Sequence, residues 1–191
     1  MKVTELAQHL HELRAANSGR SVGAAMSMME VWSAVVASPR NAISEIRYFE
    51  ASLPRPFDGM FVRLRAADAA HEAAAVYVDR RLPSHLKEFV AIKEMMHCWA
   101  PGQSYDGTPA DARNLVEALC STAGRYTPSV AADKSAIVAA AEVILPSFTV
   151  ERHIKLGHDY MAIASAHNLH VEIVEMICRI DMLHSRRNGE I

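Results

Sequence analysis

The stretch that decides the fold runs from Val76 to Pro146. It opens with VYVDRR (76–81), continues into LKEFVAIKEMMHCW (86–99) and closes with SAIVAAAEVILP (135–146). The β-branched and aromatic residues of the first segment favour a strand, whereas the apolar spacing of the other two favours helices. A strand followed closely by helices predicts a domain in which a small sheet packs on a mostly helical layer.

Upstream of this stretch, the pattern predicts two helices and then further strands. Leu6, Leu10 and Leu13 recur at helical spacing, and Pro39 ends the second helical run. The helices are expected over Thr4–Ala16 and Gly23–Ala37, and the strands over Ile46–Leu53, Gly59–Ala66 and Ala74–Asp79.

Downstream, the chain is expected to be helical to its end. The helices are predicted over Ala110–Thr122, Ala131–Leu145, Val150–His167 and Val171–Ser185. The fold class is therefore α+β, with an N-terminal helical segment (1–40) and a main domain (41–191). The N-terminal segment is compatible with a dimerisation arm or with a part of the core.

Composition excludes several classes of protein. The chain has 191 residues, of which 50% are hydrophobic and 22% charged, so a globular core is expected without a stabilising metal or disulfide. Its three cysteines are far apart, which argues against a disulfide scaffold or a zinc ribbon. Its formal net charge of -2 provides no basic field for nucleic acid. Without a signal-peptide or membrane-spanning stretch, a soluble cytoplasmic protein is expected.

The central stretch resembles the ImmA/IrrE family of zinc peptidases, known from mobile-element and stress-response regulators. In that family a strand precedes a helix of the type RF-x-x-A-HE-x-x-H, and a later helix reads E-A-N-x-F-A-A-E-L-L-M-P. Glu88–Ile92 fits the lead-in and Ala140–Pro146 fits the closing helix, while FEASLPRPFDGMFVRL (49–64) is similar to the first two strands. The resemblance covers residues 43–180 and implies a zincin-like fold.

The metal-binding pattern of this family is altered in the present sequence. A zincin uses two histidines at i and i+4, which lie on one helix face, and a glutamate that polarises the metal-bound water. Here the five residues read KEMMH, so Lys93 replaces the first histidine, while Glu94 and His97 remain. A lysine is protonated at neutral pH and offers no lone pair to a metal. The family's third ligand, a glutamate, aligns with Ser135.

The resemblance and its altered motif together predict a pseudo-peptidase that binds another protein, and the resemblance implies a prophage or stress-response repressor in a bacterium as that partner. Lys93 and Glu94 are the expected site residues, with the ammonium replacing the lost cation beside Glu94 or Asp133. No cofactor is expected. If zinc is bound, His97 and Asp133 are the candidate ligands.

Two other functions remain open on the sequence. One is an active metallopeptidase whose rearranged site uses Glu94 and His97. The other is a regulator that binds DNA or a small molecule, because residues 164–174 follow the spacing of a helix-turn-helix. The second helix of that element carries Glu172, Glu175 and Asp181, so we do not expect it to contact phosphates.

The sequence contains two further groups of residues with functional side chains, four histidines and a methionine cluster. His153, His158, His167 and His170 lack i, i+4 pairing on one face, and no second metal site is predicted there. The methionines at residues 26–29 are the best candidate for an exposed partner surface. Oligomeric state is not predicted.

Overall fold

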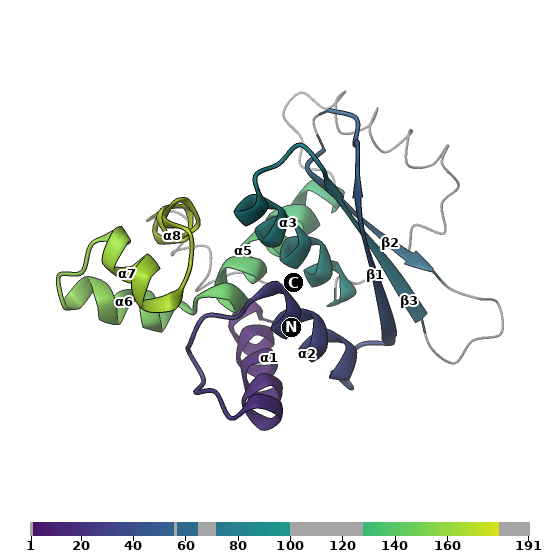
Figure 1. Cartoon of the computed structure of the whole chain (residues 1–191). Coiled ribbons are helices and arrows are strands. Elements are labelled where there is room, and N and C mark those ends of the chain that lie inside the picture. Colours follow the sequence, from purple (N-terminus) through teal and green to yellow (C-terminus); the bar gives the residue numbers. More distant parts are fainter. Residues whose placement is uncertain (1, 56, 65–71, 100–127, 180–191) are drawn as a thin grey trace.

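The computed structural model describes residues 2–55, 57–64, 72–99 and 128–179, with side chains from residue 134 onward in its last segment (Figure 1). Seven α-helices, one short 3-10 helix and three strands lie in these ranges. In chain order they are α1 (Val3–Ser18), α2 (Met28–Ala37), β1 (Ile43–Ala51), β2 (Gly59–Leu64), β3 (Glu72–Asp79), α3 (Ser84–Met96), η1 (His97–Trp99), α5 (Pro128–Ile144), α6 (Ser147–Lys155), α7 (Tyr160–His167) and α8 (Val171–Cys178).

The three strands form one mixed sheet in the order β1-β3-β2. β3 pairs in parallel with β1 and antiparallel with β2, so Val76 lies between Tyr48 and Phe61. The central position explains the composition of β3, whose run EAAAVYVD is largely buried, as expected for a strand with neighbours on both sides. The sheet and helices together confirm the α+β class.

The described helices lie on one side of the sheet (Figure 1). α3 packs on β2 and β3, α2 packs on β1 and α3, and α5 packs on α3 and α1. The apolar stripe of α1, including Leu6 and Leu10, is fully buried in the same cluster as Val76 of the sheet and Ile92 of α3. The N-terminal segment is therefore a part of the core.

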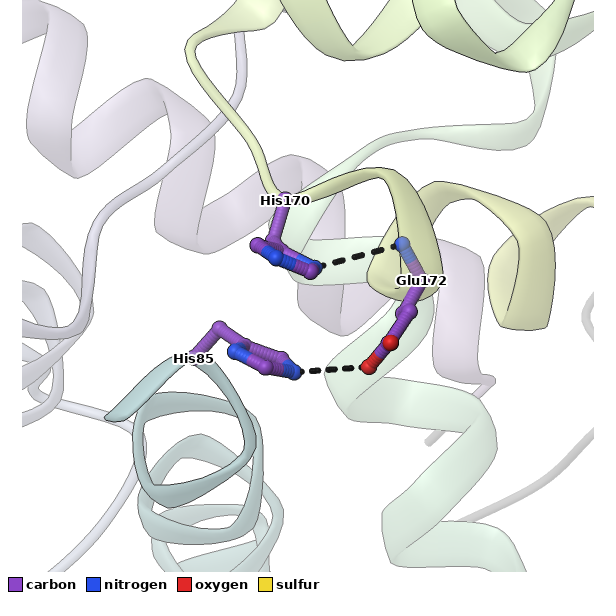
Figure 2. A group of neighbouring side chains, drawn as sticks. All are labelled: His85, His170 and Glu172. Carbon is purple, nitrogen blue, oxygen red and sulfur yellow. Dashed lines mark hydrogen bonds and ion pairs between the residues drawn. The ribbon is translucent and has the colours of Figure 1, made fainter. Parts of the chain in front are cut away.

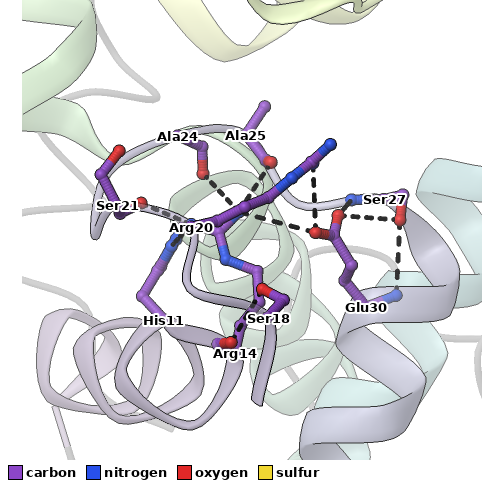
Figure 3. A network of polar contacts seen from close by, with 9 residues as sticks. All are labelled: His11, Arg14, Ser18, Arg20, Ser21, Ala24, Ala25, Ser27 and Glu30. Carbon is purple, nitrogen blue, oxygen red and sulfur yellow. Dashed lines mark hydrogen bonds and ion pairs between the residues drawn. The ribbon is translucent and has the colours of Figure 1, made fainter. Parts of the chain in front are cut away.

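A buried arginine fixes the chain between α1 and α2 (Figure 3). The Arg14 guanidinium donates hydrogen bonds to the backbone oxygens of Ser21, Ala24 and Ala25 at 2.7–3.1 Å. Nearby, Glu30 accepts a hydrogen bond from the backbone of Ser27, which caps α2. One buried side chain thus satisfies three carbonyls of a segment that has no helix or strand of its own.

Two expected helices and the expected methionine surface differ in the structure. The helix predicted over Val150–His167 is two helices, α6 and α7, because the chain turns at Gly157 with a φ of 75°. The second helix begins at Met28 rather than at Gly23. Met26 is buried in the core while Met29 is exposed, so the methionines do not form one surface stripe.

The remaining predictions for the chain's second half are only partly covered by the structure. The predicted helix over Ala110–Thr122 lies outside the described residues, as do residues 180–185 of the last predicted helix. Among the described residues, none of the helices combines the length and the apolar character needed to cross a membrane.

Candidate functional site

The turn between β3 and α3 sets the position of the altered motif. Asp79, the last residue of β3, accepts hydrogen bonds from the backbone and the guanidinium of Arg81, which also donates to the backbone oxygen of Leu53 at 2.7 Å. Hydrogen bonds from Arg81 lower the pKa of Asp79 to about 2, so its carboxylate stays ionised. Pro83 then precedes the first helical residue, Ser84.

Lys93, Glu94 and His97 lie together at the C-terminal end of α3. The Nζ atom of Lys93 lies 2.7 Å from Oε1 of Glu94, and Nε2 of His97 lies 3.7 Å from Oε2 of the same carboxylate. The side chains of Lys93, Glu94 and His97 are 14%, 4% and 9% exposed. Glu94 is thus a buried carboxylate placed between an ammonium and an imidazole.

The edge strand β2 packs directly against the Glu94 carboxylate. A Cβ atom added to Gly59 would lie 2.5 Å from Oε1 of Glu94 and 2.5 Å from Cγ1 of Val90. Such distances are far below van der Waals contact, so glycine is the residue that lets the β2 backbone approach α3 here. The ring of Phe61, further along β2, lies 5.9 Å from the ring of His97.

Arg63 holds the end of α3 against the sheet, a role that the sequence analysis missed. Its guanidinium pairs with Glu72 of β3 at 2.9 Å and donates hydrogen bonds to the backbone oxygens of His97 and Cys98. These two carbonyls belong to the short 3-10 helix that follows α3. No local pattern in the sequence signalled this role, because Arg63 is 34 and 35 residues from the two carbonyls that it binds.

The later helix supplies the other positions named by the resemblance. Ser135 is half-buried in α5, which packs on α3, and Asp133 belongs to the same helix but its side chain lies outside the described residues. Glu142 is buried and accepts hydrogen bonds from the backbone and hydroxyl of Ser147 at 3.0 and 3.1 Å. That glutamate therefore caps the start of α6.

Cys98, beside His97, is buried and its thiol is kept protonated. Burial is the main cause that raises the pKa of Cys98 to about 12, with Arg63 acting in the opposite direction. A protonated thiol is a poor nucleophile at neutral pH, because the thiolate is the reactive form.

A second cluster joins the first turns of two helices that are distant in sequence (Figure 2). His85 of α3 and His170, the N-cap of α8, stack with ring centroids 3.8 Å apart and an angle of 6° between planes. Nε2 of His85 lies 2.9 Å from Oε2 of Glu172, and Nδ1 of His170 accepts a hydrogen bond from the Glu172 backbone at 3.4 Å. One ligand atom of each residue lies within 4.8 Å of the other two.

Three other histidines form a chain of hydrogen bonds around the turn at Gly157. Nδ1 of His153 lies 2.8 Å from Nδ1 of His158, and its Nε2 atom lies 2.9 Å from Nε2 of His167. Burial lowers the pKa of His153 and of His167. Because His153 uses its two nitrogens in opposite directions, the three rings do not point at one common ion.

The last two helices, α7 and α8, are joined by a short turn and pack on each other, and the exposed face of α8 is acidic. Asn168 ends α7 with a φ of 54°, and Ala164 and Val174 are buried. Glu172 and Glu175 are exposed on α8, the helix that would enter a groove. This charge opposes contact with phosphates.

Comparison of the chain with protein-family models, with curated proteins and with solved structures gives no match.

Proposed function

We propose that the chain is a degenerate ImmA/IrrE-like pseudo-peptidase, a cytoplasmic protein that binds another protein instead of cleaving it. The buried ion pair between Lys93 and Glu94 carries this proposal. In a His-Glu-x-x-His helix the glutamate faces a metal-bound water. Here the ammonium of Lys93 pairs with the carboxylate of Glu94, in place of the metal ion that a peptidase would bind.

The residues of this site do not fit the zinc ion that the resemblance implies. A catalytic zinc needs three protein ligands with free lone pairs, and His97 is the one imidazole in the KEMMH segment. The protonated Lys93 lies 2.7 Å from Glu94, so a cation already pairs with that carboxylate. We therefore derive no hydrolytic step from Glu94.

The nature of the partner follows from the resemblance. Family members act on repressors and stress regulators of bacteria and prophages, and loss of the metal ligands removes cleavage while retaining the scaffold that contacts such a protein. The partner we propose is thus a bacterial or prophage repressor or a stress regulator.

Restoring the ligands tests the scaffold itself. We expect the double variant Lys93→His, Ser135→Glu to gain about one zinc per chain, because the two changes recreate the family's three-ligand set with His97. Adding His97→Asn to it should abolish the gain. Zinc content is measured in protein carrying His85→Ala throughout, which removes the second histidine cluster from the count. Failure of the folded double variant to gain zinc would reject the zincin-like scaffold.

Binding without cleavage is tested with the wild-type chain. A tagged chain expressed in its own host should recover a transcriptional regulator that remains uncut after incubation with zinc or manganese. The alternative function, an active metallopeptidase with a rearranged site, predicts metal-dependent cleavage of that regulator. Such cleavage, if lost in Glu94→Gln and in His97→Asn, would overturn the pseudo-peptidase proposal.

A DNA-binding regulator remains the second candidate because α7 and α8 are joined as in a helix-turn-helix. That function predicts a salt-sensitive shift of a DNA probe, weakened by Arg152→Ala in the basic end of α6. The acidic exposed residues of α8 lead us to expect no such shift.

A further inference from the structure

We propose that His85, His170 and Glu172 form a zinc-binding site that fastens α8 to α3. Two imidazoles and one carboxylate are a donor set that zinc accepts, with water in the fourth position. The three residues come from the first turn of α3 and the N-terminal end of α8, and Figure 2 shows their side chains gathered between the two helices.

The distances between the ligand atoms suit a small ion after minor adjustment. Two ligands of a tetrahedral zinc ion, each bound at roughly 2.0–2.1 Å, lie about 3.3 Å apart. Nε2 of His85 and Oε2 of Glu172 are 2.9 Å apart, and the third ligand atom lies within 4.8 Å of both. The first pair must therefore separate slightly and the His170 ring must turn toward it.

Side-chain mobility makes this adjustment inexpensive. The Glu172 side chain is 62% exposed and that of His85 is 20% exposed, so an ion reaches them directly from solvent. The three residues lie at the N-terminal ends of α3 and α8, which hold their backbones in place. Protons compete with the metal for imidazole nitrogens, so the affinity for zinc decreases as the pH falls.

The expected consequence is a tighter junction between α8 and the core. α8 contacts α3, and α7 packs on α8. A metal bound to residues of both helices stabilises the folded state, and this stabilisation grows with the logarithm of the metal concentration once that concentration exceeds the dissociation constant. The site is independent of the proposed function, because nine residues of helix, or about 13 Å, separate His85 from Glu94.

Titration of the full, tag-free, metal-stripped chain with zinc tests the proposal. We expect saturable binding of about one ion per chain and a higher melting temperature with zinc than without it. His85→Ala and Glu172→Gln should abolish the saturable binding. His170→Asn should do the same, while asparagine retains the ability to cap α8.

Matched controls separate this site from the others. His158→Asn replaces an exposed histidine in the turn before α7, and His97→Asn alters the KEMMH segment; both should bind zinc as the wild type does. Absence of saturable binding by the wild-type chain would overturn the proposal. It would also be overturned by binding that survives all three ligand substitutions, or that is lost in His97→Asn and retained in His85→Ala.

Discussion

The Nζ atom of Lys93 lies 2.7 Å from Oε1 of Glu94, within a site that is almost entirely shielded from solvent. A lone carboxylate is costly to bury, because the energy of hydration lost is several kcal/mol. The ammonium and the nearby His97 ring reduce this cost. Lys93 and His97 thus make the Glu94 carboxylate compatible with the core.

Removing the ammonium should destabilise the protein. We expect Lys93→Met to lower the free energy of unfolding by about 2 kcal/mol, less than the roughly 3–5 kcal/mol for breaking a fully buried pair, since Lys93 is 14% exposed. Urea denaturation at pH 7.5 measures the change.

A double-mutant cycle shows whether the loss belongs to the pair. Lys93→Met combined with Glu94→Gln should cost less than the sum of the two single substitutions, because the second change removes the uncompensated charge. An unchanged stability of Lys93→Met, or full additivity in the cycle, would contradict the role of this ion pair.

Gly59, the first residue of β2, should not tolerate a side chain. The Cβ atom of Gly59→Ala would lie 2.5 Å from both Glu94 and Val90, which forces β2 away from α3. We expect a loss of about 1–3 kcal/mol in the free energy of unfolding, as for other overpacked cores. Because Val90 supplies one of the two clashing atoms, Gly59→Ala with Val90→Ala should cost less than the two changes added. A stability of Gly59→Ala equal to that of the wild type would show that β2 can shift freely.

The sequence predicted the elements that depend on local pattern. The strand expected over Ala74–Asp79 is β3 (Glu72–Asp79), and its apolar run reflects its central place in the sheet. The helix after Pro83 and the helix ending at Ile144 were also anticipated, since each has a strong apolar periodicity and a proline at a boundary.

Contacts between distant segments could not be predicted in the same way. His85 and Glu172 are 87 residues apart, and they meet because α8 packs on α3, a relationship that no local pattern encodes. The break at Gly157 was missed because the flanking residues keep a helical apolar spacing on both sides. A single glycine in such a run is compatible with a continuous helix at a modest cost.

Gly157 offers a direct test of that turn. Its φ of 75° is unfavourable for a residue with a side chain, although nothing lies within 4 Å of an added Cβ atom. Gly157→Ala should therefore cost about 1 kcal/mol through backbone strain alone. Gly157→Asn should cost less, because asparagine tolerates the left-handed region better than alanine. Equal stabilities of all three proteins, measured by thermal denaturation, would contradict this account of the break.

Arg14 should be required as an arginine. Its guanidinium donates to three backbone oxygens from a side chain that is 2% exposed, and we expect Arg14→Leu to cost about 2–3 kcal/mol by leaving those acceptors unpaired. Arg14→Lys should recover less than half of that loss, since an ammonium lacks the planar set of donors that spans them. Full recovery by lysine would indicate that charge alone matters.

Stability should decrease on acidification, with His11 as a main cause. Burial, followed by the adjacent Arg14 guanidinium, lowers the pKa of His11 to about 4, compared with about 6.5 in an unfolded chain. Between these values the unfolded state binds more protons than the folded state, so the free energy of unfolding falls as the pH decreases. The loss from pH 7.5 to pH 5 should be about 2 kcal/mol from this residue.

Two substitutions in α1 test whether His11 causes the loss of stability at acidic pH. His11→Gln removes the titrating group from the core and should flatten the dependence of stability on pH between 7.5 and 5. A smaller dependence should remain, because burial also lowers the pKa of His153 and of His167. His9→Gln changes a more exposed histidine of α1 and should retain most of the wild-type slope. If His9→Gln flattened the dependence of stability on pH and His11→Gln did not, protonation of His11 would not be the cause of the acid-induced loss of stability.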